Sequence, residues 1–128
     1  MSQLTTPELF DMSGHVAVIT GAGRGIWEGI AKSFSEAGAS VIVAARRTEE
    51  IDRVAAEINE SGGSAIAVTT DVTDDDAVEN LAKSAIAEYG KLTTWVNNAG
   101  GSPVRMPLSD LPREEWDRTV ALNLTSIY

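Results

Sequence analysis

The 128-residue chain contains no cysteine and comparatively few basic residues. The lack of cysteine excludes disulfides and thiolate metal sites, and it suits a reducing environment such as the cytoplasm. Lysine and arginine total 10 against 19 acidic residues, a net charge of −9. Because no basic stripe is present to neutralise a phosphate backbone, we expect no nucleic-acid partner. Residues 1–13 lack the charged and apolar segments of a signal peptide, so the sequence predicts a cytoplasmic protein with no membrane partner.

The composition is that of an ordinary globular protein, with 43% hydrophobic and 23% charged residues. A chain of this length is expected to form a single domain. Internal repeats and low-complexity tracts are absent. We therefore divide the chain into an N-terminal extension, residues 1–13, and one domain, residues 14–128.

Short apolar runs typical of buried parallel strands alternate with segments of helical periodicity. The predicted strands are residues 15–20, 41–45, 65–69 and 92–96. A predicted helix covers residues 26–37, and three more follow the second, third and fourth strands. The helix that follows the second strand has one apolar face made of Ile51, Val54, Ala55 and Ile58. The alternation predicts an α/β fold, a Rossmann-type doubly wound parallel sheet with helices on both faces, incomplete at its C-terminal side.

Three consecutive aspartates, Asp74, Asp75 and Asp76, mark the start of the helix that follows the third strand. We expect Thr73 to be the N-cap and the aspartates to form the first turn, where negative charge meets the positive end of the helix dipole. This role explains the acidic cluster without a metal ion, and we expect no metal site.

A glycine-rich turn, residues 20–27 (TGAGRGIW), connects the first strand to the first helix. Such a turn lets the backbone approach a pyrophosphate, while free N–H groups and the helix dipole attract the charge. By itself the motif is a weak signal, because an ordinary tight turn between strand and helix has a similar composition.

Three further motifs occur in the expected order along the chain. Asp71-Val72 follows the third strand, residues 97–100 (NNAG) follow the fourth, and Asn123-Leu124 lies in the last helix. Together with the glycine-rich turn, they resemble the short-chain dehydrogenase/reductase family from about Gly14 to the last residue. The resemblance implies hydride transfer between a nicotinamide cofactor and a small-molecule alcohol or carbonyl substrate. It also implies a homo-oligomer when the protein is full length.

The resemblance assigns cofactor-binding roles to several residues. Gly21 and Gly25, with Ile26 beside them, would shape the phosphate turn. Arg24 would lie near the phosphates or the ribose; the alternative is a solvated loop charge. Asp71 and Val72 would bind the adenine amino group, although Asp71 could instead cap the next turn.

The two asparagine motifs are assigned roles in the same way. Asn98, Ala99 and Gly100 would line the cofactor, or form a purely structural turn. Asn123 would be the catalytic asparagine that holds a water in a proton relay with serine, tyrosine and lysine. Its spacing from Trp116 and Val120 places it on the same helix face, so a buried and satisfied amide is the alternative.

The end of the second strand indicates which cofactor is preferred. NAD-dependent enzymes of this fold place an acidic side chain there, against the ribose hydroxyls. Here Ala45 occupies that position and Arg46 and Arg47 follow. Because a guanidinium group matches the 2′-phosphate, which only NADP carries, we predict NADP over NAD. The alternative is that both arginines are simply solvated.

Two positions depart from the family pattern. Trp27 stands where the family has the last glycine of the turn, and we expect its indole to clash with the strand or displace the helix. The alternative is that the indole rotates outward over the adjoining loop and leaves the turn intact. Gly29 faces elsewhere on the helix and cannot replace that glycine. Thr93 stands where the family usually has aspartate.

The chain also lacks the family's catalytic Tyr-x-x-x-Lys pattern. Tyr89 is followed by Thr93 at the fourth position, and Tyr128 is the last residue. Three hypotheses remain open at this point: the cofactor-binding part of an NADP-dependent oxidoreductase, a non-catalytic nucleotide-binding module, or an inactive truncated product.

Overall fold

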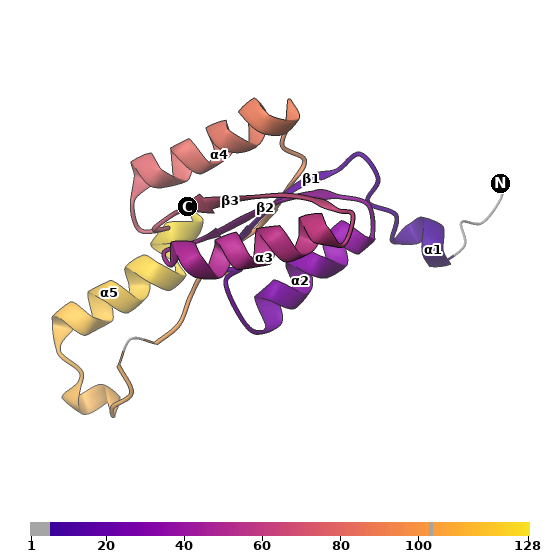
Figure 1. The fold of residues 1–128 in the computed structure, drawn as a ribbon. Coiled ribbons are helices and arrows are strands. Elements are labelled where there is room, and N and C mark those ends of the chain that lie inside the picture. The colour runs from indigo at the N-terminus through magenta and orange to yellow at the C-terminus, as the bar shows by residue number, and fades with distance from the viewer. Residues whose placement is uncertain (1–5, 103) are drawn as a thin grey trace, which may run out of the picture.

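A computed structural model describes residues 6–102 and 104–128 of the chain (Figure 1). Its strands are β1 (Val16–Thr20), β2 (Ser40–Ala45), β3 (Ser64–Thr69) and β4 (Thr94–Val96). Its α-helices are α1 (Thr6–Leu9), α2 (Ile26–Glu36), α3 (Thr48–Glu60), α4 (Asp75–Tyr89) and α5 (Arg113–Asn123). Two 3₁₀ helices, η1 (Leu108–Asp110) and η2 (Thr125–Ile127), flank α5.

All four strands are parallel and form one sheet in the order β3-β2-β1-β4. In the central register, Val18 of β1 lies between Ile42 of β2 and Trp95 of β4. The sheet therefore grows outward from β1 in both directions, which confirms the predicted parallel α/β architecture. Among the described residues, β3 and β4 are its edge strands.

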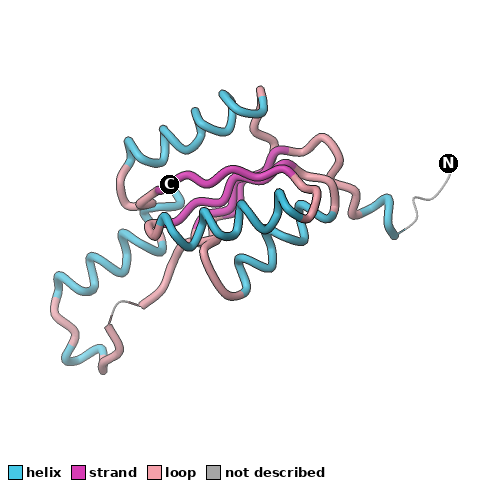
Figure 2. Tube along the Cα trace, in the orientation of Figure 1, coloured by secondary structure: helices cyan, strands magenta, loops and turns pink. Residues whose placement is uncertain are grey.

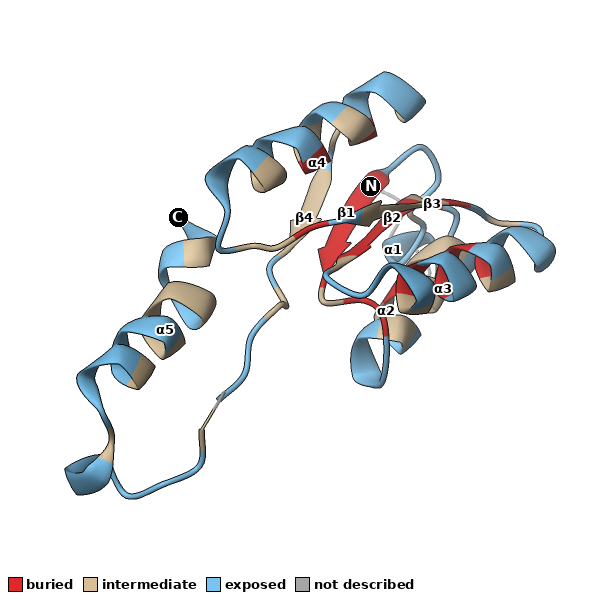
Figure 3. Cartoon of the chain, turned by 60° about the vertical axis from the view of Figure 1, so that its left-hand side comes forward, coloured by how far each residue is buried: buried red, intermediate tan, exposed pale blue. Residues whose placement is uncertain are grey.

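Helices cover both faces of the sheet (Figure 1). On one face, alternate strand residues such as Ile19 and Val43 pack with α2 and α3 in a single apolar cluster. On the other face, Val18 and Ile42 pack with Leu81 and Ala85 of α4. The central strands β1 and β2 are buried on both sides (Figure 3), as expected for a parallel sheet. The predicted apolar face of α3, Ile51, Val54, Ala55 and Ile58, is buried.

The start of α4 corrects one prediction. Its N-cap is Asp74, not Thr73, because the Asp74 side chain accepts a hydrogen bond from the Ala77 N–H at 3.2 Å. Thr73 instead donates its N–H and its hydroxyl to Asp71 Oδ1, at 2.9 and 2.7 Å. Asp71 thus fixes the residue that could have capped the helix, and the cap moves one position along the chain.

Strand β4 begins two residues later than predicted, at Thr94. Thr93 nevertheless ties this edge to β1. Its hydroxyl accepts a hydrogen bond from the Val16 N–H at 2.9 Å, and it lies 3.1 Å from the Val16 carbonyl, to which it donates. A threonine therefore joins the two strands at the position where the family usually has aspartate.

The chain after β4 leaves the sheet in a long loop and returns through η1 and α5 (Figure 2). None of the described residues of α5 is buried, and Trp116 is 48% exposed. Within residues 6–102 and 104–128, no helix is both long and apolar enough to cross a membrane.

Candidate functional site

A pocket of about 520 Å³ lies where the carboxyl ends of the strands meet. In open parallel sheets, ligands bind in the crevice outside the carboxyl ends of the strands, and the volume falls in the range of small-molecule sites. The lining residues come from the loops after all four strands and from α2, α3 and the end of α5. They are Gly21, Gly23, Arg24, Trp27, Ala45, Arg46, Arg47, Glu50, Thr70, Asp71, Val72, Asn98, Ala99, Gly100 and Leu122.

The glycine-rich turn forms one wall of this pocket. Gly21 has φ +74°, and a Cβ there would lie 3.1 Å from the Cα of Ala99. Only glycine combines that backbone conformation with such a close approach to the neighbouring loop. The turn is held to β2 because the Gly21 N–H donates to the Ala44 carbonyl at 2.6 Å. The sequence motif therefore produces a rigid turn against the loop that follows β4.

Helix α2 starts immediately after this turn. Its N-cap is Gly25, with φ 67°, and among the described residues no side chain caps the first N–H groups. Those donors have no intrahelical partner, so they are available to an anion. Neither Gly25 nor Ile26 is among the pocket-lining residues, and Ile26 is 75% exposed. Their contribution is to form the helix start.

Trp27 lies on the pocket wall and is 39% exposed. The expected clash between helix and strand does not occur. Ala31, one turn along α2, is fully buried against the sheet, and Ala22 in the turn is fully buried as well. The indole is accommodated because it points to the pocket side of the helix. Its bulk therefore lies in the space that a ligand would use, beside the glycine-rich turn.

Arginines from two of the loops line the pocket: Arg24 from the glycine-rich turn, and Arg46 and Arg47 from the end of β2. Arg47 Nη1 contacts Glu50 Oε1 at 2.7 Å, and this ion pair raises the pKa of Arg47. Arg46 lies close enough to Asp71 to favour the charged form of that carboxylate. Within residues 6–102 and 104–128, Arg24 and Arg46 form no salt bridge shorter than 4.0 Å. Arg47 is thus engaged by a carboxylate, whereas Arg24 and Arg46 are available to an anionic ligand.

Asp71 and Val72 line the pocket after β3. The hydrogen bonds from the Thr73 hydroxyl and N–H to Asp71 Oδ1 lower the pKa of Asp71, and the charge of Arg46 lowers it further. Asp71 is therefore ionised at neutral pH. It acts as the cap of the local turn, which was the alternative role considered from the sequence, and it still lines the pocket.

The segment after β4 is bound tightly to β1. Thr20 Oγ1 accepts hydrogen bonds from the N–H groups of Asn98 and Ala99, both at 3.0 Å. Asn98 Nδ2 donates to the Thr20 carbonyl at 2.8 Å. Its Oδ1 atom is buried, and among the described residues it has no hydrogen-bond partner. An unpaired buried acceptor is unfavourable, so this atom suits a ligand that brings a donor.

Asn123 is exposed and lies outside the pocket lining, so the alternative role as a buried amide is wrong. Its Nδ2 donates to the carbonyls of Gly101 and Thr119, at 2.7 and 2.8 Å. Its Oδ1 accepts from the Gly101 N–H at 2.9 Å. Because a helix-terminal residue reaches the loop on which Gly100 sits, the side chain joins the end of α5 to the wall of the pocket.

Six lining residues were not singled out as binding residues from the sequence: Gly23, Trp27, Ala45, Glu50, Thr70 and Leu122. Gly23 belongs to the recognised turn, so its position in the motif could have indicated it. Glu50 and Leu122 lie on the helices α3 and α5, and no local pattern separates them from other helical residues. Only the folded arrangement of those helices brings their side chains to the pocket.

The comparisons with known proteins agree with this geometry. The family model described as short chain dehydrogenase matches residues 15–128, and the chain belongs to that family. It is 42% identical, over 91% of its length, to 7alpha-hydroxysteroid dehydrogenase of Escherichia coli strain K12, of which it covers 45%. It is 39% identical, over 88% of its length, to cis-4-hydroxycyclohexanecarboxylate dehydrogenase of Sinomonas cyclohexanicum, of which it again covers 45%.

Solved structures resemble the chain over the same region. A short-chain type dehydrogenase/reductase from Mycobacterium marinum has a TM-score of 0.90 at 39% identity, covering 97% of this chain and 50% of that one. A metagenomic short-chain oxidoreductase in complex with NADP has a TM-score of 0.84 at 38% identity, covering 91% of this chain and 52% of that one. The 128-residue chain thus spans about half the length of the relatives it matches.

Proposed function

We propose that this chain is the cofactor-binding part of an NADP-dependent oxidoreductase that transfers hydride between NADPH and a small-molecule alcohol or carbonyl substrate. The observation that carries the proposal is the pocket at the carboxyl ends of the strands, bounded by the glycine-rich turn and by Arg46. A related structure of the same family is bound to NADP, which supports the choice of cofactor. Cytoplasmic residence, as predicted from the sequence, is part of the same proposal.

The residues present fit a dinucleotide phosphate. In the part of the chain that the structure describes, no side chain caps the first N–H groups of α2, and these groups would receive the pyrophosphate. Asn98 Oδ1 is a buried acceptor that would take a hydrogen bond from the ligand. Arg46 would pair with the 2′-phosphate, and Asp71 with Val72 would bind the adenine amino group. Gly21, Ala99 and Gly100 would leave room for the ribose and the phosphates.

When bound, the cofactor supplies the hydride, and the residues of this chain bind and orient it. Asn123 would act by holding Gly101, and so the loop that follows β4, at a fixed distance from the end of α5. In the wider family the acid/base tyrosine, its lysine and a serine complete the reaction. No Tyr-x-x-x-Lys pattern is present in this chain. We therefore assign catalysis, and the homo-oligomer, to the full-length protein.

The substrate class follows from the family and its named relatives. Two similar proteins carry names that specify dehydrogenation of a hydroxyl group, on a steroid in one case and on a cyclohexane ring in the other. We infer that the full-length protein interconverts an alcohol and a carbonyl compound of comparable kind.

A non-catalytic or inactive product is the second candidate function, and Trp27 specifically favours it. The indole lines the pocket at the position where the family has glycine, and Trp27 is 39% exposed. A ligand that reached the uncapped N–H groups of α2 would have to pass the indole or displace it. This arrangement favours weak cofactor binding even though the remainder of the pocket is formed.

Isothermal titration of the 128-residue chain with NADPH and NADH tests the proposal. We expect binding of both nucleotides, with the lower dissociation constant for NADPH, because Arg46 lines the pocket and no carboxylate stands at the end of β2. Absence of binding by either nucleotide would favour the inactive product. Tighter binding of NADH would contradict the assignment of NADP.

A further inference from the structure

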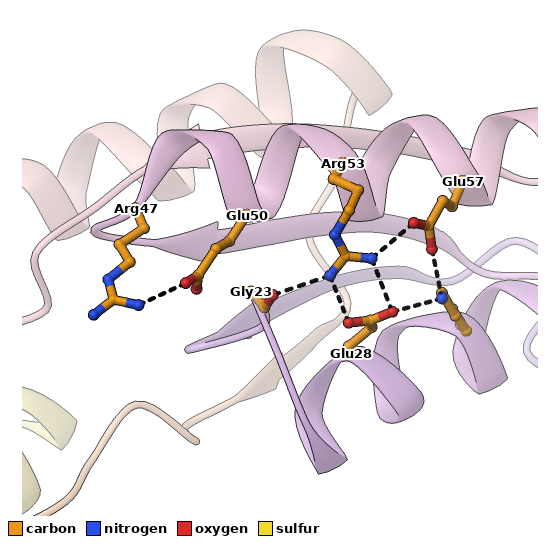
Figure 4. A network of polar contacts seen from close by, with 7 residues as sticks. Gly23, Glu28, Arg47, Glu50, Arg53 and Glu57 are labelled. Atoms are coloured by element: carbon orange, nitrogen blue, oxygen red, sulfur yellow. Dashed lines mark hydrogen bonds and ion pairs between the residues drawn. The ribbon is translucent and has the colours of Figure 1, made fainter.

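Glu50 is a carboxylate inside the nucleotide pocket that no sequence motif indicated. It lies in the first turn of α3, lines the pocket, and its side chain is 29% exposed. It packs against the glycine-rich turn, because a Cβ added at Gly23 would lie 2.8 Å from Glu50 Oε2 and 2.9 Å from Glu50 Cβ. The close-up in Figure 4 shows Glu50 between Gly23 and Arg47. Its position is therefore determined by packing.

Arg47 is the more exposed partner in the ion pair with this carboxylate. Its Nη1 atom lies 2.7 Å from Glu50 Oε1, and its side chain is 65% exposed, more than twice the exposed fraction of Glu50. The residues are three apart on one helix turn, where side chains meet readily. Because Glu50 is packed and Arg47 is solvated, the Glu50 carboxylate fixes the position of the Arg47 guanidinium. The guanidinium does not fix the position of the carboxylate.

The pair changes the charge that the pocket offers to a ligand. Three arginines, Arg24, Arg46 and Arg47, line it together with two carboxylates, Glu50 and Asp71. Asp71 is engaged by Thr73 through two hydrogen bonds, whereas Glu50 is engaged by Arg47. One of the two arginines from which NADP preference was predicted is therefore already neutralised.

We propose that Glu50 is a specificity-determining residue that limits the preference for NADP over NAD by holding Arg47 and keeping a negative charge in the pocket wall. This inference rests on the proposed function. A 2′-phosphate must compete with Glu50 for Arg47, and it also meets a like charge nearby. A ribose hydroxyl, in contrast, can donate a hydrogen bond to a carboxylate. Glu50 thus disfavours the ligand that carries the phosphate and tolerates the ligand that does not.

The test is a double-mutant cycle on Glu50→Gln and Arg47→Ala in the 128-residue chain, with NADPH and NADH affinities measured by isothermal titration. Glutamine keeps the shape that packs on Gly23 and removes the charge. We expect Glu50→Gln to raise NADPH affinity by about fivefold, which corresponds to the free energy of a partly exposed ion pair. NADH affinity should stay within about twofold of the parent value. Arg47→Ala should have little effect in the parent and should remove the gain in the Glu50→Gln background.

Glu49→Gln is the matched control, because Glu49 lies in the same helix turn, is exposed and does not line the pocket. Adenosine 2′,5′-bisphosphate against adenosine 5′-monophosphate repeats the contrast with ligands that lack the dinucleotide pyrophosphate. An unchanged or lower NADPH preference in Glu50→Gln, or an equal gain in Glu49→Gln, would overturn the role of Glu50 alone. Failure of the parent and of Glu50→Gln to bind any of the four ligands would overturn this role together with the proposed function.

Discussion

Arg53 of α3 holds Glu28 of α2 through both carboxylate oxygens, with Nη1 3.2 Å from Oε1 and Nη2 2.7 Å from Oε2. Lys32 and Glu57 extend the contact into a four-residue network that joins the two helices. Figure 4 shows Arg53 in contact with both Glu28 and Glu57. Arg53 Nη2 also lies 3.4 Å from the Gly23 carbonyl. The network therefore connects the packing of two helices on one face of the sheet to the glycine-rich turn of the pocket.

This network predicts how stability depends on pH. The hydrogen bonds from Arg53, then those from Lys32, lower the pKa of Glu28 to about 2. A carboxylate with a lowered folded-state pKa stabilises the protein above its unfolded value, near 4.5, and this contribution is lost as the pH falls through that value toward 2. We expect Glu28→Gln to lower the free energy of unfolding at pH 7 by about 1–2 kcal/mol, after allowance for the partly exposed Arg53.

Urea unfolding of the parent and of Glu28→Gln at several pH values checks this prediction, and the two curves should converge toward pH 2. Glu79→Gln is the control, because the Glu79–Lys83 pair is well exposed on both sides and should contribute little. A difference between parent and Glu28→Gln that stays constant from pH 7 to the acid end would contradict the ionic role of Glu28.

Removal of Arg46 is expected to reduce NADPH affinity far more than NADH affinity. Arg46 lines the pocket and, unlike Arg47, is free of a close ion pair within the described ranges 6–102 and 104–128. Hydrogen bonds to charged groups contribute roughly 1.5–3 kcal/mol, so Arg46→Ala should weaken NADPH binding about tenfold or more. Isothermal titration measures both affinities, with the exposed Arg113→Ala, on α5 away from the pocket, as control. Parallel losses for the two nucleotides would show that Arg46 does not contact the 2′-phosphate.

Replacement of Trp27 by glycine is expected to improve NADPH binding. The indole lines the pocket beside the first N–H groups of α2, and recovery of even one charge-assisted hydrogen bond would raise the affinity about tenfold. Position 27 does not require the conformational freedom of glycine, because within residues 6–102 and 104–128 no residue other than glycine, and therefore not Trp27, has a positive φ.

Trp27→Ala separates bulk from backbone flexibility and should recover most of the gain. Both variants are compared with the parent by titration with NADPH, in this chain and in a form extended to the length of its relatives. Equal dissociation constants for all three proteins would refute the steric argument. The indole would then simply move aside when the ligand binds.

The 128-residue chain by itself is expected to show no oxidoreductase turnover. Hydride transfer in the family needs an acid/base tyrosine next to a lysine, and the sequence contains no Tyr-x-x-x-Lys. The check is a spectrophotometric assay of NADPH oxidation with a panel of ketones and aldehydes, run beside a full-length relative as a positive control. Turnover that persists through further purification would refute the prediction.

Local patterns in the sequence were sufficient for the four strands, for the helices α2 to α5 and for their order. Buried parallel strands appear in the sequence as continuous apolar runs, and amphipathic helices appear as apolar residues three or four positions apart. As a result, β1, β2 and β3 each begin within one residue of the predicted start. Two of the errors, the N-cap at Asp74 and the shorter β4, arose where side-chain hydrogen bonds compete with the expected cap or with strand pairing. Such competition depends on contacts that periodicity does not describe.

The sequence by itself determined the family, the parallel sheet and the loops that carry the pocket, because glycines, β-branched runs and short polar motifs constrain the backbone locally. The tertiary structure decided which side chains share the pocket and in what state. It brought Glu50 against Gly23, turned Trp27 toward the ligand space and left Asn98 Oδ1 without a hydrogen-bond partner among the described residues. Each of these relationships joins side chains from different elements or sets their burial, so it depends on how helices pack on the sheet and not on the order of residues along the chain.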